Sequence, residues 1–75
     1  DGRFMFNNVE LEEIAKQISR WYDVEVFFTN ENVKRTRFTG GMVKFKPLDD
    51  LIRMIESTSP VRFSVKGKTI VISGG

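Results

Sequence analysis

The fold of this chain is decided by the stretch LEEIAKQISRWYDVEVFF, residues 11–28. A second stretch, LDDLIRMIESTSPVRFSV at residues 48–65, aligns with it without a gap after a shift of 37 positions. In both copies apolar residues first recur at the i, i+3, i+4, i+7 spacing of an amphipathic helix and then alternate as in a strand. The sequence therefore predicts two copies of a strand–helix–strand unit.

The two predicted helices carry apolar stripes in the same phase. The stripes are Leu11, Ile14, Ala15, Ile18 and Tyr22 in the first copy and Leu48, Leu51, Ile52 and Ile55 in the second. Asn7 and Asn8 are expected to form the N-cap of the first helix, and Asp23 its end. Pro47 suits the first turn of the second helix, where a missing N–H costs nothing, and Pro60 marks its stop.

Strands are predicted on both sides of each helix, at residues 3–6, 24–28, 35–38 (continuing past the glycines), 61–65 and 69–72. Residues 29–34 are polar and are expected to form a turn, and Gly67 lies in a predicted hairpin turn. Apolar parity is even at Phe38 but odd at Val43 and Phe45, which predicts a bulge or bend at Gly40-Gly41.

Helices with one apolar stripe and strands with one apolar face bury these surfaces when helix packs on helix and strands cover both. The predicted class is α+β, with the order β-α-β-β-α-β-β and two βαβ repeats. Seventy-five residues fit one domain, and residues 1–75 are expected to form it.

Composition excludes several kinds of functional site. The chain has no cysteine and no histidine, which removes disulfides, cysteine-based zinc sites and the commonest general base. The carboxylate pairs Glu12-Glu13 and Asp49-Asp50 stand at the predicted helix starts, where they complement the helix dipole. We therefore expect no catalytic residue, no metal site and no cofactor, and an enzyme is the least favoured class.

Five basic residues, Lys34, Arg35, Arg37, Lys44 and Lys46, follow the middle of the chain. Such a strip could bind an acidic partner or, beside aromatic residues, single-stranded nucleic acid. The favoured interpretation is that these charges blunt an exposed strand edge. A net charge of only +2 also argues against a nucleic-acid partner.

Longer motifs carry a family resemblance. They are Phe4-x-Phe6-x-Asn8-x-x-Leu11-Glu12-Glu13-Ile14, Ile18-x-x-Trp21-Tyr22-Asp23-Val24, Arg37-Phe38-Thr39-Gly40, Pro47-Leu48-Asp49-Asp50-Leu51, Pro60-Val61-Arg62-Phe63 and Gly67-x-Thr69-Ile70-Val71-Ile72. The chain thus resembles the C-terminal domain of FecR-like anti-sigma regulators of the Bacteroidetes type. That family is similar to the short N-terminal domain of secretins and TonB-dependent transducers, which implies two helices side by side between two small sheets.

The resemblance implies a periplasmic, non-enzymatic protein-interaction module. Its expected partner is the signalling domain of a TonB-dependent outer-membrane transporter. Contact with the sigma factor and with the membrane would belong to other parts of the full-length regulator, and no nucleic acid is involved. Two alternatives stay open: a short N-terminal signalling or assembly domain of a secretin or transducer, and a small nucleic-acid-binding domain.

Partner binding is expected at exposed strand edges, which can accept a strand from another protein. The candidate edges are residues 35–39 and 69–73, with Met5 and Phe27 as apolar support if their strands are neighbours. The candidate partner-binding residues are Met5, Phe27, Arg35, Arg37, Thr39, Thr69 and Val71. Met54, like Met5, Phe27 and Val71, is apolar but lies outside the predicted inward-facing pattern.

Overall fold

The computed structural model describes residues 2–44 and 46–75, so the predicted inward position of Phe45 lies outside the described residues. The elements are β1 (Arg3–Glu10), α1 (Leu11–Tyr22), β2 (Glu25–Phe28), α2 (Glu31–Lys34), β3 (Arg37–Val43), α3 (Leu48–Thr58), β4 (Val61–Lys66) and β5 (Thr69–Gly74). The α+β class and the predicted order are confirmed. The one addition is α2, a single helical turn in the expected polar turn, where the Asn30 side chain accepts the Val33 N–H.

Each of the two sheets combines strands from both copies of the repeat. β1 and β3 form an antiparallel pair, and the second sheet has the strand order β2-β5-β4. Within it, β2 runs parallel to β5, and β4 runs antiparallel to β5. The two copies are therefore interleaved, because neither sheet can form from one copy alone.

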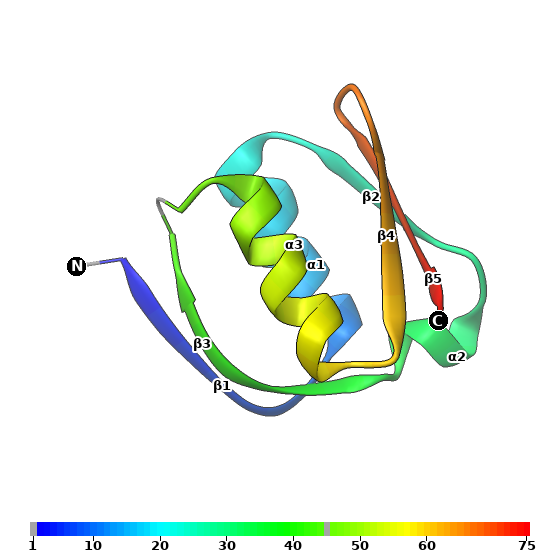
Figure 1. Ribbon diagram of the computed structural model, residues 1–75, viewed down its shortest axis with the longest axis horizontal. Coiled ribbons are helices and arrows are strands. Elements are labelled where there is room, and N and C mark those ends of the chain that lie inside the picture. Colours follow the sequence, from blue (N-terminus) through cyan, green and yellow to red (C-terminus); the bar gives the residue numbers. More distant parts are fainter. Residues whose placement is uncertain (1, 45) are drawn as a thin grey trace.

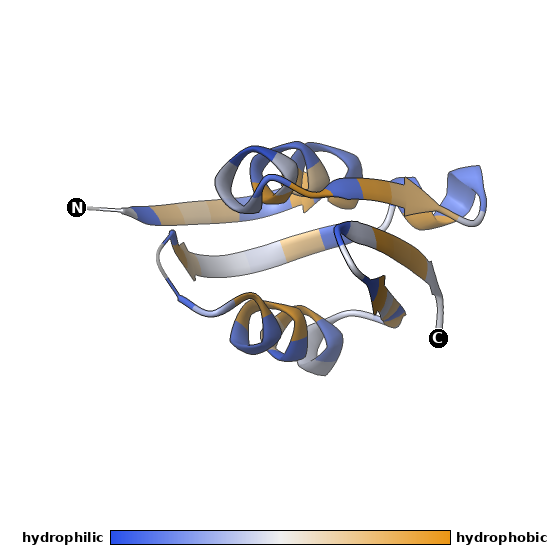
Figure 2. Ribbon diagram, turned by 90° about the horizontal axis from the view of Figure 1, so that it is seen from above, coloured by the Kyte–Doolittle hydropathy of each residue, from blue (hydrophilic) through white to orange (hydrophobic). Residues whose placement is uncertain are grey.

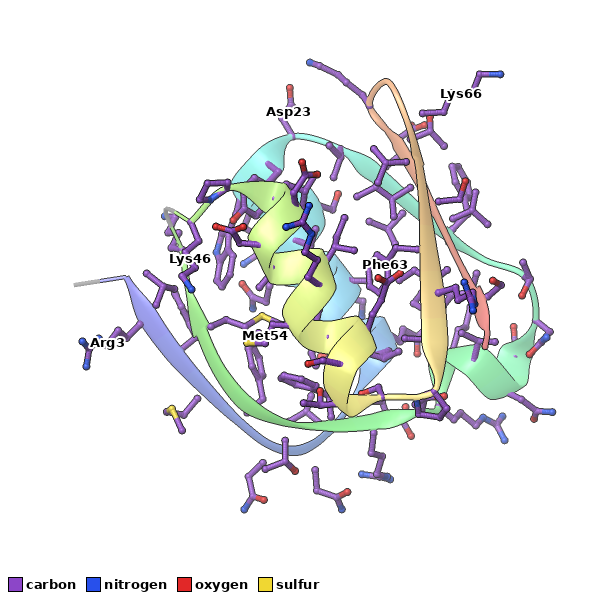
Figure 3. The ribbon with its side chains drawn as sticks, in the orientation of Figure 1. Arg3, Asp23, Lys46, Met54, Phe63 and Lys66 are labelled. Carbon is purple, nitrogen blue, oxygen red and sulfur yellow. The ribbon has the colours of Figure 1, made fainter. Side chains whose placement is uncertain are left out.

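The two long helices lie side by side between the sheets (Figure 1). Figure 2 shows that the apolar residues of both helices turn toward the space between them. The largest fully buried side chains are Leu11, Ile14, Ile18, Met42, Leu51, Ile55, Ile70 and Ile72. Met54, expected outside the inward pattern, packs partly buried against this core and extends from α3 toward the two-stranded sheet, while Phe63 reaches in from β4 (Figure 3).

The expected N-cap at Asn7 and Asn8 is wrong, because β1 continues through both residues to Glu10, which caps α1 without a side-chain hydrogen bond. Instead, both asparagines lie opposite Thr39 in a β-bulge between Phe6 and Val9. Asn8 has φ 57°, a left-handed conformation that asparagine adopts more readily than most residues. Its N–H donates to Thr39 Oγ1 at 2.9 Å. The bulge thus lies on β1, and β3 is the regular strand.

The predicted change of parity at Gly40-Gly41 is also wrong. Phe38 and Met42 are both buried and Val43 is exposed, so even-numbered residues face the core along the whole of β3. A Cβ built at Gly40 would lie 2.8 Å from Phe38 Cζ. Glycine at this position leaves room for the Phe38 ring, which explains why a residue without a side chain stands on an inward-facing site.

Three predicted turns and ends agree with the structure. Asp23 ends α1 in a left-handed conformation, with φ 54°. Gly67, with φ 61°, is the first of two residues between β4 and β5, the position that favours glycine in a type II′ hairpin turn. α3 ends with an extended Ser59 before Pro60. Pro47, expected in the first turn of this helix, instead precedes Leu48 as the N-cap.

Candidate strand-addition interface

The structure separates the two exposed apolar residues that would form one patch if their strands were neighbours. Met5 on β1 is 82% exposed and Phe27 on β2 is 52% exposed. The condition for a shared patch, that their strands are neighbours, is not met, because β1 pairs with β3 whereas β2 pairs with β5. Met5 lies beside Gly41 of β3, and Phe27 lies beside Val71 of β5 on the outer face of the three-stranded sheet.

The predicted free edge at residues 69–73 is wrong as well. β5 is the central strand of its sheet, with β2 on one side and β4 on the other. Thr69 is opposite Glu25 on β2 and opposite Lys66 on β4, so its backbone is enclosed on both sides. Thr69 and Val71 could meet a partner only through the outer face of the sheet, and their role stays a prediction.

The first predicted edge, residues 35–39, comprises the C-cap of α2 and the first residues of β3. Arg35 caps the C-terminus of α2, and within the described residues β3 pairs with β1 alone. The side chains of Arg37 and Thr39 are turned to the bulge: Arg37 Nη1 donates to the Asn8 carbonyl at 2.8 Å, and Thr39 Oγ1 accepts the Asn8 N–H. These side chains therefore stabilise the β1–β3 pair in addition to any contact with a partner.

The basic strip is partly neutralised by neighbouring carboxylates. Lys34 Nζ lies 3.1 Å from Glu31 Oε2, and Arg37 Nη2 lies 3.6 Å from Glu10 Oε2. This arrangement agrees with the interpretation of solvated charges along a strand edge and makes a continuous cationic track for nucleic acid less favourable.

A further strand edge, that of β2, was missed by the sequence reasoning. Glu25 N–H donates to the Lys68 carbonyl at 2.8 Å and Thr29 N–H donates to the Ile72 carbonyl at 3.0 Å, so these amides face β5. Successive residues of a strand point their backbone groups to opposite sides. The N–H and C=O groups of Val26 and Phe28 therefore point away from β5, toward the free edge of the sheet.

A groove of about 500 Å³ runs between this edge and α1. It is lined by Glu12, Ala15, Lys16, Ser19, Arg20, Val26, Phe28 and Lys34. Its apolar surface comes from Val26 and Phe28 of β2 and from Ala15 of α1. Its lining includes three cationic side chains and one carboxylate, that of Glu12. Lys16 Nζ is 3.0 Å from Glu13 Oε2, and this hydrogen-bonded carboxylate raises the pKa of Lys16.

On the opposite edge of the same sheet, formed by β4, the outward amides of Val61 and Phe63 already have acceptors. Phe63 N–H donates to Glu56 Oε2 at 2.8 Å, and Val61 N–H donates to the Ser59 carbonyl at 2.8 Å. A second, smaller groove lies here, between the end of α3 and the start of β4, and Glu56 also lines it. Of the two edges of the three-stranded sheet, β2 is therefore the more open.

The sequence profile of the family described as FecR, C-terminal, matches residues 3–72. The chain belongs to the FecR C-terminal family. This confirms the family resemblance in the sequence motifs. Among proteins of curated function, none matches the chain in sequence.

Two crystal structures share the FecR C-terminal fold seen here. Both are of a candidate anti-sigma factor from Parabacteroides distasonis ATCC 8503, at 1.65 Å and 2.50 Å resolution. They superpose with TM-scores of 0.83 and 0.82, at 19% and 20% identity, over 99% of this chain. The match covers 34% of each of those chains, so this chain spans about a third of their length.

Two kinds of feature are absent from the described part of this FecR C-terminal chain. Across residues 2–44 and 46–75, no group of three or more His, Cys, Asp or Glu side chains is placed to hold a metal ion. No helix in the same residues is long and apolar enough to cross a membrane.

Tyr22 donates its hydroxyl to the Lys46 carbonyl, and burial raises the pKa of that hydroxyl. This tyrosine joins α1 to the loop before α3.

Proposed function

We propose that this chain is the periplasmic protein-interaction module of a transmembrane FecR-like anti-sigma regulator. Its partner is the signalling domain of a TonB-dependent outer-membrane transporter. The proposal is carried by the family match over residues 3–72. In this proposal the sigma factor is held by another part of the full-length protein, and the membrane is crossed by a span outside this chain.

The mode of binding that we propose is strand addition. The two sheets have only two and three strands, so most of the strands in this small protein lie at the edge of a sheet. An extended partner segment that pairs with such an edge gains main-chain hydrogen bonds, and side-chain pockets beside the edge select its sequence. Binding of this kind needs no catalytic group, and the module is non-enzymatic in this proposal.

The test is a pull-down with the purified chain immobilised, against detergent-solubilised outer membranes of the source organism, read by mass spectrometry. We expect enrichment of one TonB-dependent transporter and loss of that enrichment when its N-terminal signalling domain is deleted. Titration calorimetry with the isolated signalling domain then measures the affinity. If the folded chain retains no transporter and does not bind the signalling domain, the proposed function is wrong.

A further inference from the structure

The internal repeat allows the two outer edges of the three-stranded sheet to be compared residue by residue. After the shift of 37 positions, Val26 on β2 corresponds to Phe63 on β4, and Ser19 on α1 corresponds to Glu56 on α3. In the second copy, the Glu56 carboxylate accepts the outward N–H of Phe63 at 2.8 Å. A carboxylate placed on an edge amide is a device that prevents another strand from pairing there.

The first copy lacks this device. Ser19 has a short side chain whose hydroxyl donates to the Val24 carbonyl at 2.6 Å, and within the described residues no amide of β2 donates to it. One turn earlier, Ala15 stands where the second copy has Ile52. The two smaller residues leave space beside the strand, and the groove of about 500 Å³ lies there. The outward amide of Val26 therefore opens onto a groove instead of onto a carboxylate.

We propose that this β2 edge, with the groove beside α1, receives an extended segment of the transporter's signalling domain; the inference rests on the proposed function. The segment lies along β2 as a fourth strand of the sheet. Its backbone pairs with the N–H and C=O groups of Val26 and Phe28, which are turned away from β5. Side chains on one face of the segment enter the groove, since successive residues of a strand point to opposite faces.

The lining of the groove defines the chemistry of this segment. Ala15, Val26 and Phe28 provide an apolar surface, which favours apolar side chains at the positions that face it. Of the three lining cations, Lys16 and Lys34 are paired with Glu13 and Glu31, whereas Arg20 has no ion pair within the described residues. The bound segment is therefore apolar on its groove-facing side and carries an acidic residue opposite Arg20. An Arg–carboxylate pair gives geometric selectivity as well as energy.

The decisive variant transfers the blocking residue from one copy to the other. Ser19→Glu places a carboxylate where Glu56 stands in the second copy, beside the amide of Val26. Ser19→Ala is the matched control, because it removes the same hydroxyl bond to Val24 and leaves the edge open. Binding of each variant to the isolated signalling domain is measured by titration calorimetry, and folding is checked by thermal melts.

We expect Ser19→Glu to weaken binding at least about tenfold relative to Ser19→Ala. Arg20→Glu should also weaken binding, and a charge reversal of the facing acidic residue in the signalling domain should restore it. Glu56→Ser, which uncovers the other edge, should not weaken binding. Equal affinity of the Ser19→Glu variant and the original chain would overturn the inference while leaving the proposed function intact. If the original chain does not bind at all, both are overturned.

Amide hydrogen exchange provides a second readout that needs no substitution. In the complex the amides of Val26 and Phe28 should exchange more slowly than in the free chain, whereas that of Phe63 should not change. Exchange at Val26 and Phe28 that is unaffected by the partner would contradict the inference, even if Ser19→Glu failed to fold. Self-association in sedimentation that is lost in Ser19→Glu, with transporter binding retained, would assign the edge to a second copy of the chain and overturn the proposal.

Discussion

Both repeats contribute side chains to one hydrophobic core, called here the shared core. Equivalent isoleucines of the two repeats should therefore lower the free energy of unfolding by similar amounts when they are truncated. Ile18 on α1 and Ile55 on α3 are related by the 37-residue shift, and both are fully buried in one cluster. We expect Ile18→Val and Ile55→Val to destabilise the whole chain to a similar extent, because each removes one methylene group from the same core.

The magnitude follows from the burial of these side chains. A buried Ile→Val change costs about 0.5–1.5 kcal/mol, from the lost transfer free energy and the small cavity left behind. At about 0.05–0.15 kcal/mol per residue, a chain of this length has a free energy of unfolding of about 4–11 kcal/mol. A loss of about 1 kcal/mol lowers Tm by about 4–8 °C at this size. Met5→Ala is the control, since Met5 is 82% exposed and its truncation should change little.

The assay is urea unfolding followed both by tryptophan fluorescence and by far-ultraviolet circular dichroism. Trp21 reports on the first copy, where its ring centroid lies 4.7 Å from that of Phe4. Both probes should give the same midpoint, with an unchanged urea dependence of the unfolding free energy. If Ile18→Val shifts only the fluorescence transition, or Ile55→Val only the dichroism transition, the two copies unfold separately and the shared-core reasoning is refuted.

Three further predictions concern the ends and edges of the elements. Asn8→Gly should raise Tm slightly and Asn8→Val should lower stability by about 1–2 kcal/mol, because a β-branched residue is strained at φ 57°; equal melting curves for the two variants would contradict this. Glu56→Ala should cost about 1–2 kcal/mol in urea unfolding, since it leaves the Phe63 N–H without its charged acceptor, and Glu56→Gln should recover part of the loss. Burial raises the pKa of Tyr22 in the folded state, so the stability that it contributes is complete below the ordinary pKa and is lost as pH rises through the folded-state pKa. Tyr22→Phe should therefore lose less stability than the original chain between about pH 9 and 11, and identical pH profiles would be inconsistent with that shift.

The candidate interface was only partly predictable from the sequence. The edge at residues 35–39 could be anticipated from its polar, extended character, and β3 does have one unpaired side within the described residues. The β2 edge was missed, although a signal was present: Ser19 replaces Glu56 and Ala15 replaces Ile52 when the copies are aligned. That signal has no meaning until the structure shows that Glu56 covers the Phe63 amide.

The sequence by itself determined the elements of this protein other than α2. The two apolar stripes, the alternation after each helix, the end of α1 at Asp23 and the hairpin turn at Gly67 are local patterns, and each depends on residues close together in the chain. Most of the fully buried side chains follow from the same periodicity, because the face of a helix or strand is set by its spacing.

Only the tertiary structure decided which strands are neighbours. β2 pairs with β5, more than forty residues away, and this places β5 in the centre of its sheet and separates Phe27 from Met5. Alternating strands with one apolar face fit several pairings equally well, since backbone hydrogen bonds do not depend on the side chains. The choice is made by the simultaneous burial of both helices between two sheets, and no local pattern contains it.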